Sequence, residues 1–284
     1  MSCQLYQLAP QTHTQMMGYV LQTDDALIVL DGGTAGDAPF LRELLHRLGG
    51  AQPHITAWFL THPHHDHVGA FVALMEGPDA PVVEQVYHCF PSRQLLEKGE
   101  PGALTIYDAF ERLCPRLQET ILAENMTLQI GETHWKVLYV SEPNLYHNAS
   151  NNSSCVLKLT VEGVDVLFLG DLGREGGEIL LRGHRGELPS QVVQMAHHGQ
   201  SAVAMDVYEA IRPQMCLWCT PDWLWRCDQG HRGYDSGYWD ILLVRRTMNA
   251  LGVRRHVVAK DGTACITLQD GTVQVSCYDP FAAQ

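Results

Sequence analysis

Long hydrophobic runs are absent from this sequence of 284 residues, and basic residues are scarce. No apolar stretch approaches the roughly 20 residues that a transmembrane helix needs, so we expect no membrane partner. The N-terminal segment has neither the basic nor the sustained apolar region of a secretory signal, which favours a cytoplasmic protein. Lys and Arg number 19 against 32 Asp and Glu, a net charge of −13, which disfavours a nucleic-acid partner and favours a small-molecule substrate.

Cysteine occurs in an odd number, nine, spread from Cys3 to Cys277. An odd, scattered set argues against a full disulfide framework and for reduced thiols in a cytosol. The chain is long enough to bury a core without such crosslinks. Its apolar content of 45% and charged content of 18% are those of an ordinary globular protein. The composition gives no indication of the oligomeric state.

Short apolar stretches alternate with amphipathic ones along the chain, which indicates strands mixed with helices. Strands are expected at residues 26–30, 56–60, 81–89, 127–130, 134–140, 155–161, 164–170, 191–196, 214–219, 256–259, 264–269 and 272–277. Helices are expected at residues 38–50, 68–77, 104–125 with a break or kink at Pro115, 175–183, 204–212 and 238–253. This order predicts an α/β fold of one domain over residues 1–284, a four-layer αββα sandwich of two mixed β-sheets with helices on the outer faces.

Residues 61–69, THPHHDHVG, place four histidines and one aspartate within six consecutive positions, directly after an expected strand. Neutral imidazole and carboxylate are ligands that suit Zn²⁺ and similar ions. His62 and His64 are two positions apart, so one turn can bring both to one metal, while Asp66 and His67 can reach a second. A solvated polar turn is the alternative reading of such a tract.

The stretch from Thr61 to His67 matches the pattern T-H-x-H-x-D-H completely, and here the sequence resembles the metallo-β-lactamase-fold hydrolases. The resemblance implies a centre of two divalent metal ions, Zn²⁺ foremost with Mn²⁺ or Fe²⁺ as options. It assigns His62, His64, Asp66 and His67 as metal ligands. Asp66 is also expected to take part in catalysis.

Further positions follow in the order that the resemblance implies. Asp31, in IVLDGG, corresponds to a residue that supports the histidine loop without binding metal, although an ordinary turn aspartate is the alternative. Asp171, in VLFLGDLG, corresponds to a catalytic carboxylate that bridges both metals. The competing reading of that segment as a phosphate-binding loop lacks the lysine and the spacing of a P-loop. In the pair that follows strand 191–196, His197 is taken as a metal ligand because it leaves the strand first, and His198 as the catalytic proton donor or substrate contact, with the reverse left open.

One element departs from the family pattern. Most relatives carry another histidine between the positions of His67 and Asp171, and here the stretch reads HNASNNSSCVLKL. Asn151 or Asn152 occupies that position, with His147 a few residues earlier, so all three are possible ligands or supporting residues. This form, with AHHGQSA downstream, resembles the subgroup of the competence-protein hydrolase domain and the phosphorylcholine esterases. Because asparagine is a poor zinc ligand, the first site is expected to be weaker, completed by water or His147, or selective for Mn²⁺.

The segment 219–239 packs aromatic residues, glycines and two arginines between a strand and a helix. A pocket wall that binds an apolar or cationic group by stacking is one reading, and an aromatic core under a long loop is the other. The candidate substrate-binding residues are Trp223, Trp225, Tyr238 and Trp239.

These features together predict a metal-dependent hydrolase that attacks its substrate, most simply a phosphodiester, with a metal-bound hydroxide. Hydrolysis of a lactone, thioester or β-lactam by the same fold is the alternative within enzymes. A metal-binding module that has lost turnover is the alternative from another class, and the missing histidine near Asn151 is the feature that supports it.

Overall fold

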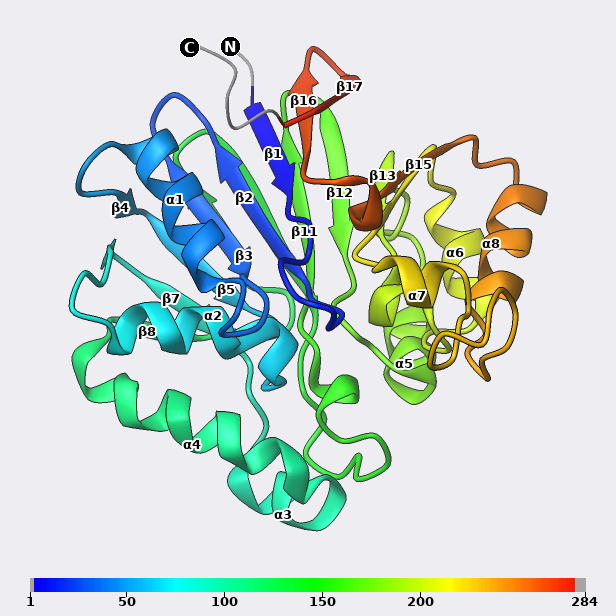
Figure 1. Cartoon of the computed structure of the whole chain (residues 1–284), viewed down its shortest axis with the longest axis horizontal. Helices are drawn as coiled ribbons and strands as arrows, with labels where there is room; N and C mark the ends of the chain where they lie inside the picture. Colours follow the sequence, from blue (N-terminus) through cyan, green and yellow to red (C-terminus); the bar gives the residue numbers. More distant parts are fainter. Residues whose placement is uncertain (1–2, 279–284) are drawn as a thin grey trace.

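The computed structural model describes residues 3–278, and its centre consists of two mixed β-sheets packed face to face (Figure 1). The spatial order of the first sheet is β17 (Thr272–Cys277), β16 (Ala264–Gln269), β1 (Cys3–Gln7), β2 (Gly18–Gln22), β3 (Leu27–Asp31), β5 (Ala57–Leu60), β7 (Val86–His88) and β8 (Glu119–Ile121). In this sheet β3, β5, β7 and β8 run parallel, and the other pairs are antiparallel.

The second sheet repeats this mixture of parallel and antiparallel pairing. Its spatial order is β15 (Arg255–Val258), β14 (Met215–Trp218), β13 (Val192–Gln194), β12 (Val164–Phe168), β11 (Val156–Val161), β10 (Thr133–Tyr139) and β9 (Thr127–Ile130). Strands β12 to β15 are parallel. A small parallel pair is formed separately by β4 (His54–Ile55) and β6 (Val82–Val83). The carboxyl ends of β5, β12 and β13 carry the residues of the metal-ligand motifs.

Helices cover both outer faces, which makes four layers (Figure 1). The first sheet packs against α1 (Ala38–Gly49), α2 (His65–Glu76) and α4 (Leu104–Leu113), and the second against α5 (Arg174–His184), α6 (Met205–Ile211) and α8 (Ile241–Ala250). The short helices are α3 (Arg93–Gly99), α7 (Asp222–Trp225) and the 3-10 turns η1 (Pro101–Ala103), η2 (Cys114–Arg116), η3 (Asn151–Ser153), η4 (Ala196–Gly199) and η5 (Ala259–Asp261).

Three apolar layers hold the sandwich together. Side chains such as Tyr19, Phe59 and Phe168 fill the space between the two sheets and are almost completely buried. Trp58 and Phe71 belong to the layer between the first sheet and its helices. A third layer lies between the second sheet and its helices. The strand faces alternate between these layers, as expected for sheets buried on both sides. The predicted αββα architecture is therefore confirmed.

Two expected elements differ in the structure. The expected helix over 104–125 is wrong beyond Pro115, because α4 ends at Leu113 and the chain then forms η2 and the edge strand β8. Proline lacks the N–H that a helix interior requires and disfavours helical geometry at the residue before it. The expected helix at 68–77 begins three residues earlier, at His65. This earlier start places Asp66 and His67 in the first turn of α2.

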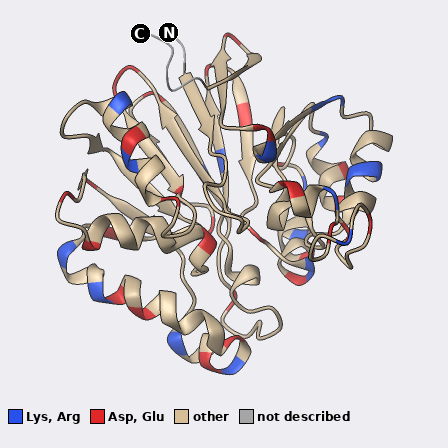
Figure 2. Ribbon diagram, in the orientation of Figure 1, with Lys and Arg blue, Asp and Glu red and all other residues tan. Residues whose placement is uncertain are grey.

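Charged residues lie mainly on the helices and loops, and few lie on the strands (Figure 2). Among the described residues, no helix has the length and apolar character needed to cross a membrane. Charge inside the sandwich is concentrated at one end of the strands, where the predicted ligands meet.

Candidate metal centre

Side chains from four separate segments converge at the end of the sandwich. His62 and His64 lie in the turn after β5, and Asp66 and His67 lie in the first turn of α2. Asp171 follows β12 in the second sheet, and His198 lies in η4, after β13. The carboxyl ends of parallel strands are a common place for functional residues, because loops from several strands meet there. The convergence expected from the sequence is present.

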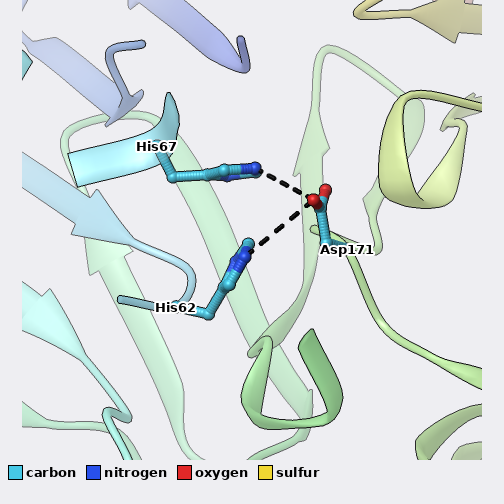
Figure 3. A group of neighbouring side chains, drawn as sticks. All are labelled: His62, His67 and Asp171. Carbon is cyan, nitrogen blue, oxygen red and sulfur yellow. Dashed lines mark ion pairs between the residues drawn. The ribbon is translucent and has the colours of Figure 1, made fainter. Parts of the chain in front are cut away.

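Two groups of side chains could each hold a metal ion, and Asp171 lies against both. In the first, Asp171 Oδ2 lies 3.9 Å from His62 Nε2 and 3.2 Å from His67 Nε2 (Figure 3). In the second, which comprises Asp66, His67 and His198, His198 Nε2 lies 3.3 Å from Asp66 Oδ2. The same nitrogen lies 3.3 Å from Asp171 Oδ2. All five side chains are buried.

Hydrogen bonds on the outer side of the rings fix which nitrogen of His62 and of His67 faces the centre. Asp31 Oδ2 lies 2.7 Å from His67 Nδ1, so that nitrogen carries the proton because a carboxylate only accepts. Thr61 Oγ1 donates to Asp31 at 2.8 Å and lies 3.1 Å from His62 Nδ1, so it accepts from that ring. Both Nε2 atoms therefore present lone pairs inward. Asp31 supports the histidine loop in the manner the resemblance implied.

The other two rings are fixed in the same way. The backbone oxygen of Cys219 lies 2.9 Å from His198 Nδ1 and accepts its proton, which leaves Nε2 facing the carboxylates. Glu100 Oε1 lies 2.7 Å from His64 Nε2, so here Nε2 carries the proton and Nδ1 is the free nitrogen. Thus each of the four imidazoles is held in the tautomer that a metal ligand needs.

Several inward atoms have no hydrogen-bond partner in the protein, and this tests whether a cation fits. His62 Nε2 and His64 Nδ1 lie 3.1 Å apart, and two lone pairs at that distance repel unless a cation lies between them. His67 Nε2, His198 Nε2 and Asp171 Oδ1 are buried without a hydrogen bond. Buried polar atoms are almost always partnered, so unpartnered ones that converge indicate a missing ligand. Imidazole nitrogens and carboxylate oxygens fit divalent metal ions.

The electrostatics of the centre lead to the same conclusion. Burial disfavours the charged form of His198, but Asp171 and Asp66 more than offset this and raise its pKa to about 9. Burial likewise opposes ionisation of Asp171, yet the neighbouring His198 and His67 hold its pKa well below the usual value. The pKa of Asp66 is also lowered, against its burial, by His198 and His67. The buried carboxylates therefore require positive charge nearby, which metal ions provide.

At two turns, unusual backbone geometry positions residues of the centre. A Cβ atom on Gly69 would lie 2.8 Å from the backbone nitrogen of Ala35, so only glycine lets the start of α2 approach that loop. His197 and His198 both have positive φ, 49° and 55°, which non-glycine residues rarely adopt. Such strain persists where the surrounding structure enforces it, often at functional sites.

The distances favour the reverse of the assignment preferred from the sequence for the histidine pair. His198 is fully buried and belongs to the second ligand group. His197 is partly exposed, its Nε2 lies 4.0 Å from Asp171 Oδ2, and its ring lines the cleft outside the centre. Chain order misled here because both residues adopt left-handed backbone geometry, which the order of residues in the sequence does not reveal.

The asparagine segment, which is the stretch HNASNNSSCVLKL at residues 147–159, contains residues with different surroundings. Asn152 makes hydrogen bonds to His147, Glu175 and Gly176, so its amide is occupied by the protein. Asn151 is 5% exposed and its Oδ1 has no partner. The His147 side chain is 80% exposed and pairs with Glu175, which takes it away from the centre.

Glu100 was not identified from the sequence. It stands 36 positions after His64, between α3 and η1, and no spacing connects the two residues. Its Oε2 accepts a hydrogen bond from the backbone of Ser150 at 3.0 Å. Burial raises the pKa of Glu100, but the hydrogen bonds from His64 and from the backbone N–H of Ser150 lower it overall. A carboxylate in the short segment KGEPG offers no pattern that sequence reasoning could have used.

A cleft of about 660 Å³ opens beside the centre. Its walls are formed by Gln15, His64, His65, Asp66, Glu100, Gly102, Ala103, Thr105, Ile106, Ala109 and His197. The lining contains no lysine or arginine. One wall, built by η1 and α4, is largely apolar.

The aromatic residues expected to bind substrate do not line this cleft. Trp223 and Trp239 pack edge to face at 4.9 Å and line a separate cleft of about 690 Å³. Trp225 contacts Trp218 and lies under the guanidinium of Arg245. Tyr238 is 76% exposed. Trp223 instead donates a hydrogen bond to the backbone oxygen of His13 at 2.8 Å, and His13 lines the same separate cleft.

A family model described as "Metallo-beta-lactamase superfamily" matches residues 17–214, which include every candidate ligand. Solved structures share the fold at low sequence identity. The metallo-beta-lactamase fold protein YhfI from Bacillus subtilis matches 92% of this chain and 98% of its own at 14% identity and a TM-score of 0.56. Yeast PDE1 matches 95% and 100% at 12% identity and a TM-score of 0.54. CmlA, a diiron beta-hydroxylase from Streptomyces venezuelae, matches 94% and 54% at 11% identity and a TM-score of 0.55.

One curated relative is similar over a short segment. Competence protein ComA of Neisseria gonorrhoeae is 37% identical over 68 residues, which is 24% of this chain and 10% of that protein. The matched segment therefore represents a tenth of the length of that relative. This likeness agrees with the subgroup that the asparagine segment and AHHGQSA resemble.

Proposed function

Because the chain belongs to the metallo-beta-lactamase superfamily, we propose that it is a hydrolase that uses two divalent metal ions, Zn²⁺ foremost, on a phosphodiester substrate. The observation that carries the proposal is the convergence of four imidazoles, each held with its free nitrogen facing Asp171 and its neighbours. A structural role alone would not require buried nitrogens without partners.

The ligands divide between the two ions as the distances suggest. His62 Nε2 and His64 Nδ1 would hold the first ion. Asp66, His67 and His198 would hold the second, and Asp171 would contact both. Asn151 would contribute its free Oδ1 to the first ion, since this buried acceptor has no other partner. An amide oxygen is a harder ligand than imidazole, so Mn²⁺ or Fe²⁺ is the natural competitor of Zn²⁺ at that position.

Divalent ions held in this way would lower the pKa of a water molecule into the neutral range and stabilise negative charge on the reacting group. The protein supplies the remaining parts of the reaction. Asp31, Thr61 and the Cys219 carbonyl keep three of the rings oriented. His197, which lines the cleft, would contact the substrate and give a proton to the leaving group.

The charge of the cleft favours a phosphodiester over a phosphomonoester. Two dications would bring four positive charges to the four carboxylates of Asp31, Asp66, Asp171 and Glu100, which leaves no excess positive charge to hold a dianion. A dianionic monoester would need basic side chains, and none lines the cleft. Ala103, Ile106 and Ala109 offer an apolar surface for the alcohol portion of a small diester.

Hydrolysis of a lactone or thioester is the second candidate, favoured by the same apolar wall. A neutral acyl substrate would gain from the metals through its developing oxyanion alone. Loss of turnover is the third, and the ligand set argues against it because Asp171 and three of the four rings are fully protected from solvent.

A substrate panel tests the proposal. The purified protein is reconstituted with Zn²⁺ or Mn²⁺ and assayed on chromogenic phosphodiester, phosphomonoester, lactone, thioester and cephalosporin substrates, with His64→Ala as the inactive control. We expect turnover of the diester to exceed that of the monoester. Turnover confined to an acyl substrate would replace the phosphodiester proposal with the second candidate. Absence of turnover on every substrate in metal-loaded protein would favour the degenerate module.

A further inference from the structure

We propose that Glu100 is a positioning residue for the first metal ion, holding the His64 ring with Nδ1 toward the ion and connecting that ring to the helices beside the cleft. The inference rests on the proposed two-metal centre. It adds to that centre a residue that lies outside the histidine motif and outside the motifs around Asp171 and His198.

The hydrogen bonds of the Glu100 carboxylate determine the tautomer of His64. Oε1 lies 2.7 Å from His64 Nε2, and Oε2 accepts from the backbone N–H of Ser150 at 3.0 Å. A carboxylate has no proton to donate, so Nε2 carries the ring proton. The lone pair is then on Nδ1, which lies 3.1 Å from His62 Nε2. Rotating or flipping the His64 ring would break the bond to Glu100.

The backbone around Glu100 is held on both sides. Its N–H donates to the Leu96 carbonyl at 2.8 Å, and its carbonyl accepts from the Ala103 N–H at 3.1 Å. Next to it, a Cβ atom on Gly99 would lie 2.5 Å from the carbonyl oxygen of Tyr146, so only glycine lets the end of α3 approach that loop. The carboxylate is therefore fixed between the histidine turn and the asparagine segment, where a rigid support must be.

The same segment builds the apolar wall of the cleft. Glu100 is followed directly by η1 and α4, whose residues Ala103, Ile106 and Ala109 line the cleft. One short stretch of chain thus orients a ligand of the first ion and shapes the space above it. The second ion has no such link, because the rings of His67 and His198 are supported by Asp31 and by the Cys219 carbonyl.

The test is the Glu100→Gln variant titrated with Zn²⁺. An amide has one acceptor oxygen where the carboxylate has two, so it cannot accept from both His64 and Ser150. Losing such an outer partner typically costs about 10- to 100-fold in metal affinity. We expect one of two binding events to weaken by that factor and the other to stay within about twofold. The matched control is Glu97→Gln, which makes the same charge change on α3 at an exposed residue paired with Arg93.

A spectroscopic measurement on the wild-type protein tests the inference even if the Glu100→Gln variant folds poorly. In ¹H–¹⁵N spectra of Zn²⁺-loaded wild-type protein, we expect the His64 ring proton on Nε2, protected from exchange by Glu100, and loss of that protection in Glu100→Gln. A His64 proton on Nδ1, or equal affinity for both ions in the variant and the wild type, would overturn the inference. Wild-type protein that binds fewer than two Zn²⁺ ions would overturn the proposed centre itself, and the inference with it.

Discussion

The two halves of the metal centre are enclosed to different degrees. The half formed by Asp66, His67 and His198 is nearly enclosed by protein, with every side chain at most 6% exposed, and only Asp66 of the three reaches the wall of the cleft. In the other half His62 is fully buried, but the His64 side chain is 20% exposed and lines the cleft. The closed half offers three candidate ligands beside the Asp171 carboxylate, whereas the open half offers two imidazoles.

This difference in enclosure indicates which half of the centre is shaped by the core of the fold and which half faces the cleft. The closed half is determined by the fold, because its ligands leave strand and helix ends that pack in the core. The open half faces the cleft, and under the proposal its neighbours Asn151 and Glu100 would influence which ion it prefers and how its ligands are held. Changes in the closed half should therefore remove an ion, while changes in the open half should weaken the binding of one.

Replacing the residue common to both halves should have the largest effect. Asp171 Oδ2 lies within 4.0 Å of His62, His67, His197 and His198 nitrogens. We expect Asp171→Asn to lose both ions and to reduce hydrolysis by at least about 10²- to 10³-fold, the scale on which removal of one electrostatic stabiliser acts. Metal analysis and steady-state kinetics measure this. Retention of two ions and wild-type turnover would contradict the shared role.

The neighbouring histidines provide a matched pair. His198→Ala should remove one ion, because His198 is a buried member of the closed half. His197→Ala should keep both ions and lower kcat by about 10²-fold on a diester with an alkyl leaving group, which needs a proton. With a nitrophenolate leaving group, which does not, the loss should be small. Equal losses on both substrates would show that His197 acts on something other than the leaving group.

Asn151 and Asn152 are adjacent, but we expect Asn151 to bind metal and Asn152 to stabilise the fold. Asn152→Ala should lower the free energy of unfolding by about 1–3 kcal/mol, because it leaves the buried N–H of Gly176 without its acceptor. Asn151→Ala removes a buried oxygen that has no partner, so it should cost little stability and weaken the first ion alone. Urea unfolding of metal-free protein and Zn²⁺ titration measure the two effects. Swapped phenotypes would reverse the roles of the two residues.

Replacing His184, which belongs to neither ligand group, should have the smallest effect. His184 lies between Glu124, at 2.6 Å, and Glu187, at 2.9 Å. Burial lowers the pKa of His184, but hydrogen bonds to the two carboxylates raise it overall above 6.5. The stabilisation is therefore complete below that unfolded-state pKa and is lost as the pH rises through the folded-state pKa.

The His184→Gln variant measures this contribution. Its deficit in unfolding free energy relative to wild type should be about 1 kcal/mol or less at pH 5.5 and smaller at pH 9, because such partly exposed pairs contribute little. The measurement is urea unfolding of metal-free protein at both values. A deficit that grows with pH would contradict the charged form of His184.

How far the sequence reveals the centre depends on whether the ligands are contiguous. The tract from His62 to His67, the aspartate at the end of β3 and the aspartate after β12 could be identified because strand ends place them by short-range geometry. The order of His197 and His198 could not, because both adopt left-handed backbone geometry that residue order does not reveal. The partnership of Glu100 with His64 could not either, since it arises only when α3 packs against the loop before η3. The expectation that aromatic residues of segment 219–239 bind substrate was misleading, because the composition of a loop does not reveal which cleft its side chains line.

The most direct test of the two-ion centre is anomalous diffraction from crystals of the Zn²⁺-loaded protein, recorded on both sides of the zinc absorption edge. We expect two peaks about 3.5–4 Å apart, one beside His62 and His64, the other beside Asp66, His67 and His198, with Asp171 reaching both. No peak among these side chains, or zinc bound only elsewhere on the chain, would contradict the centre on which the proposed hydrolase depends.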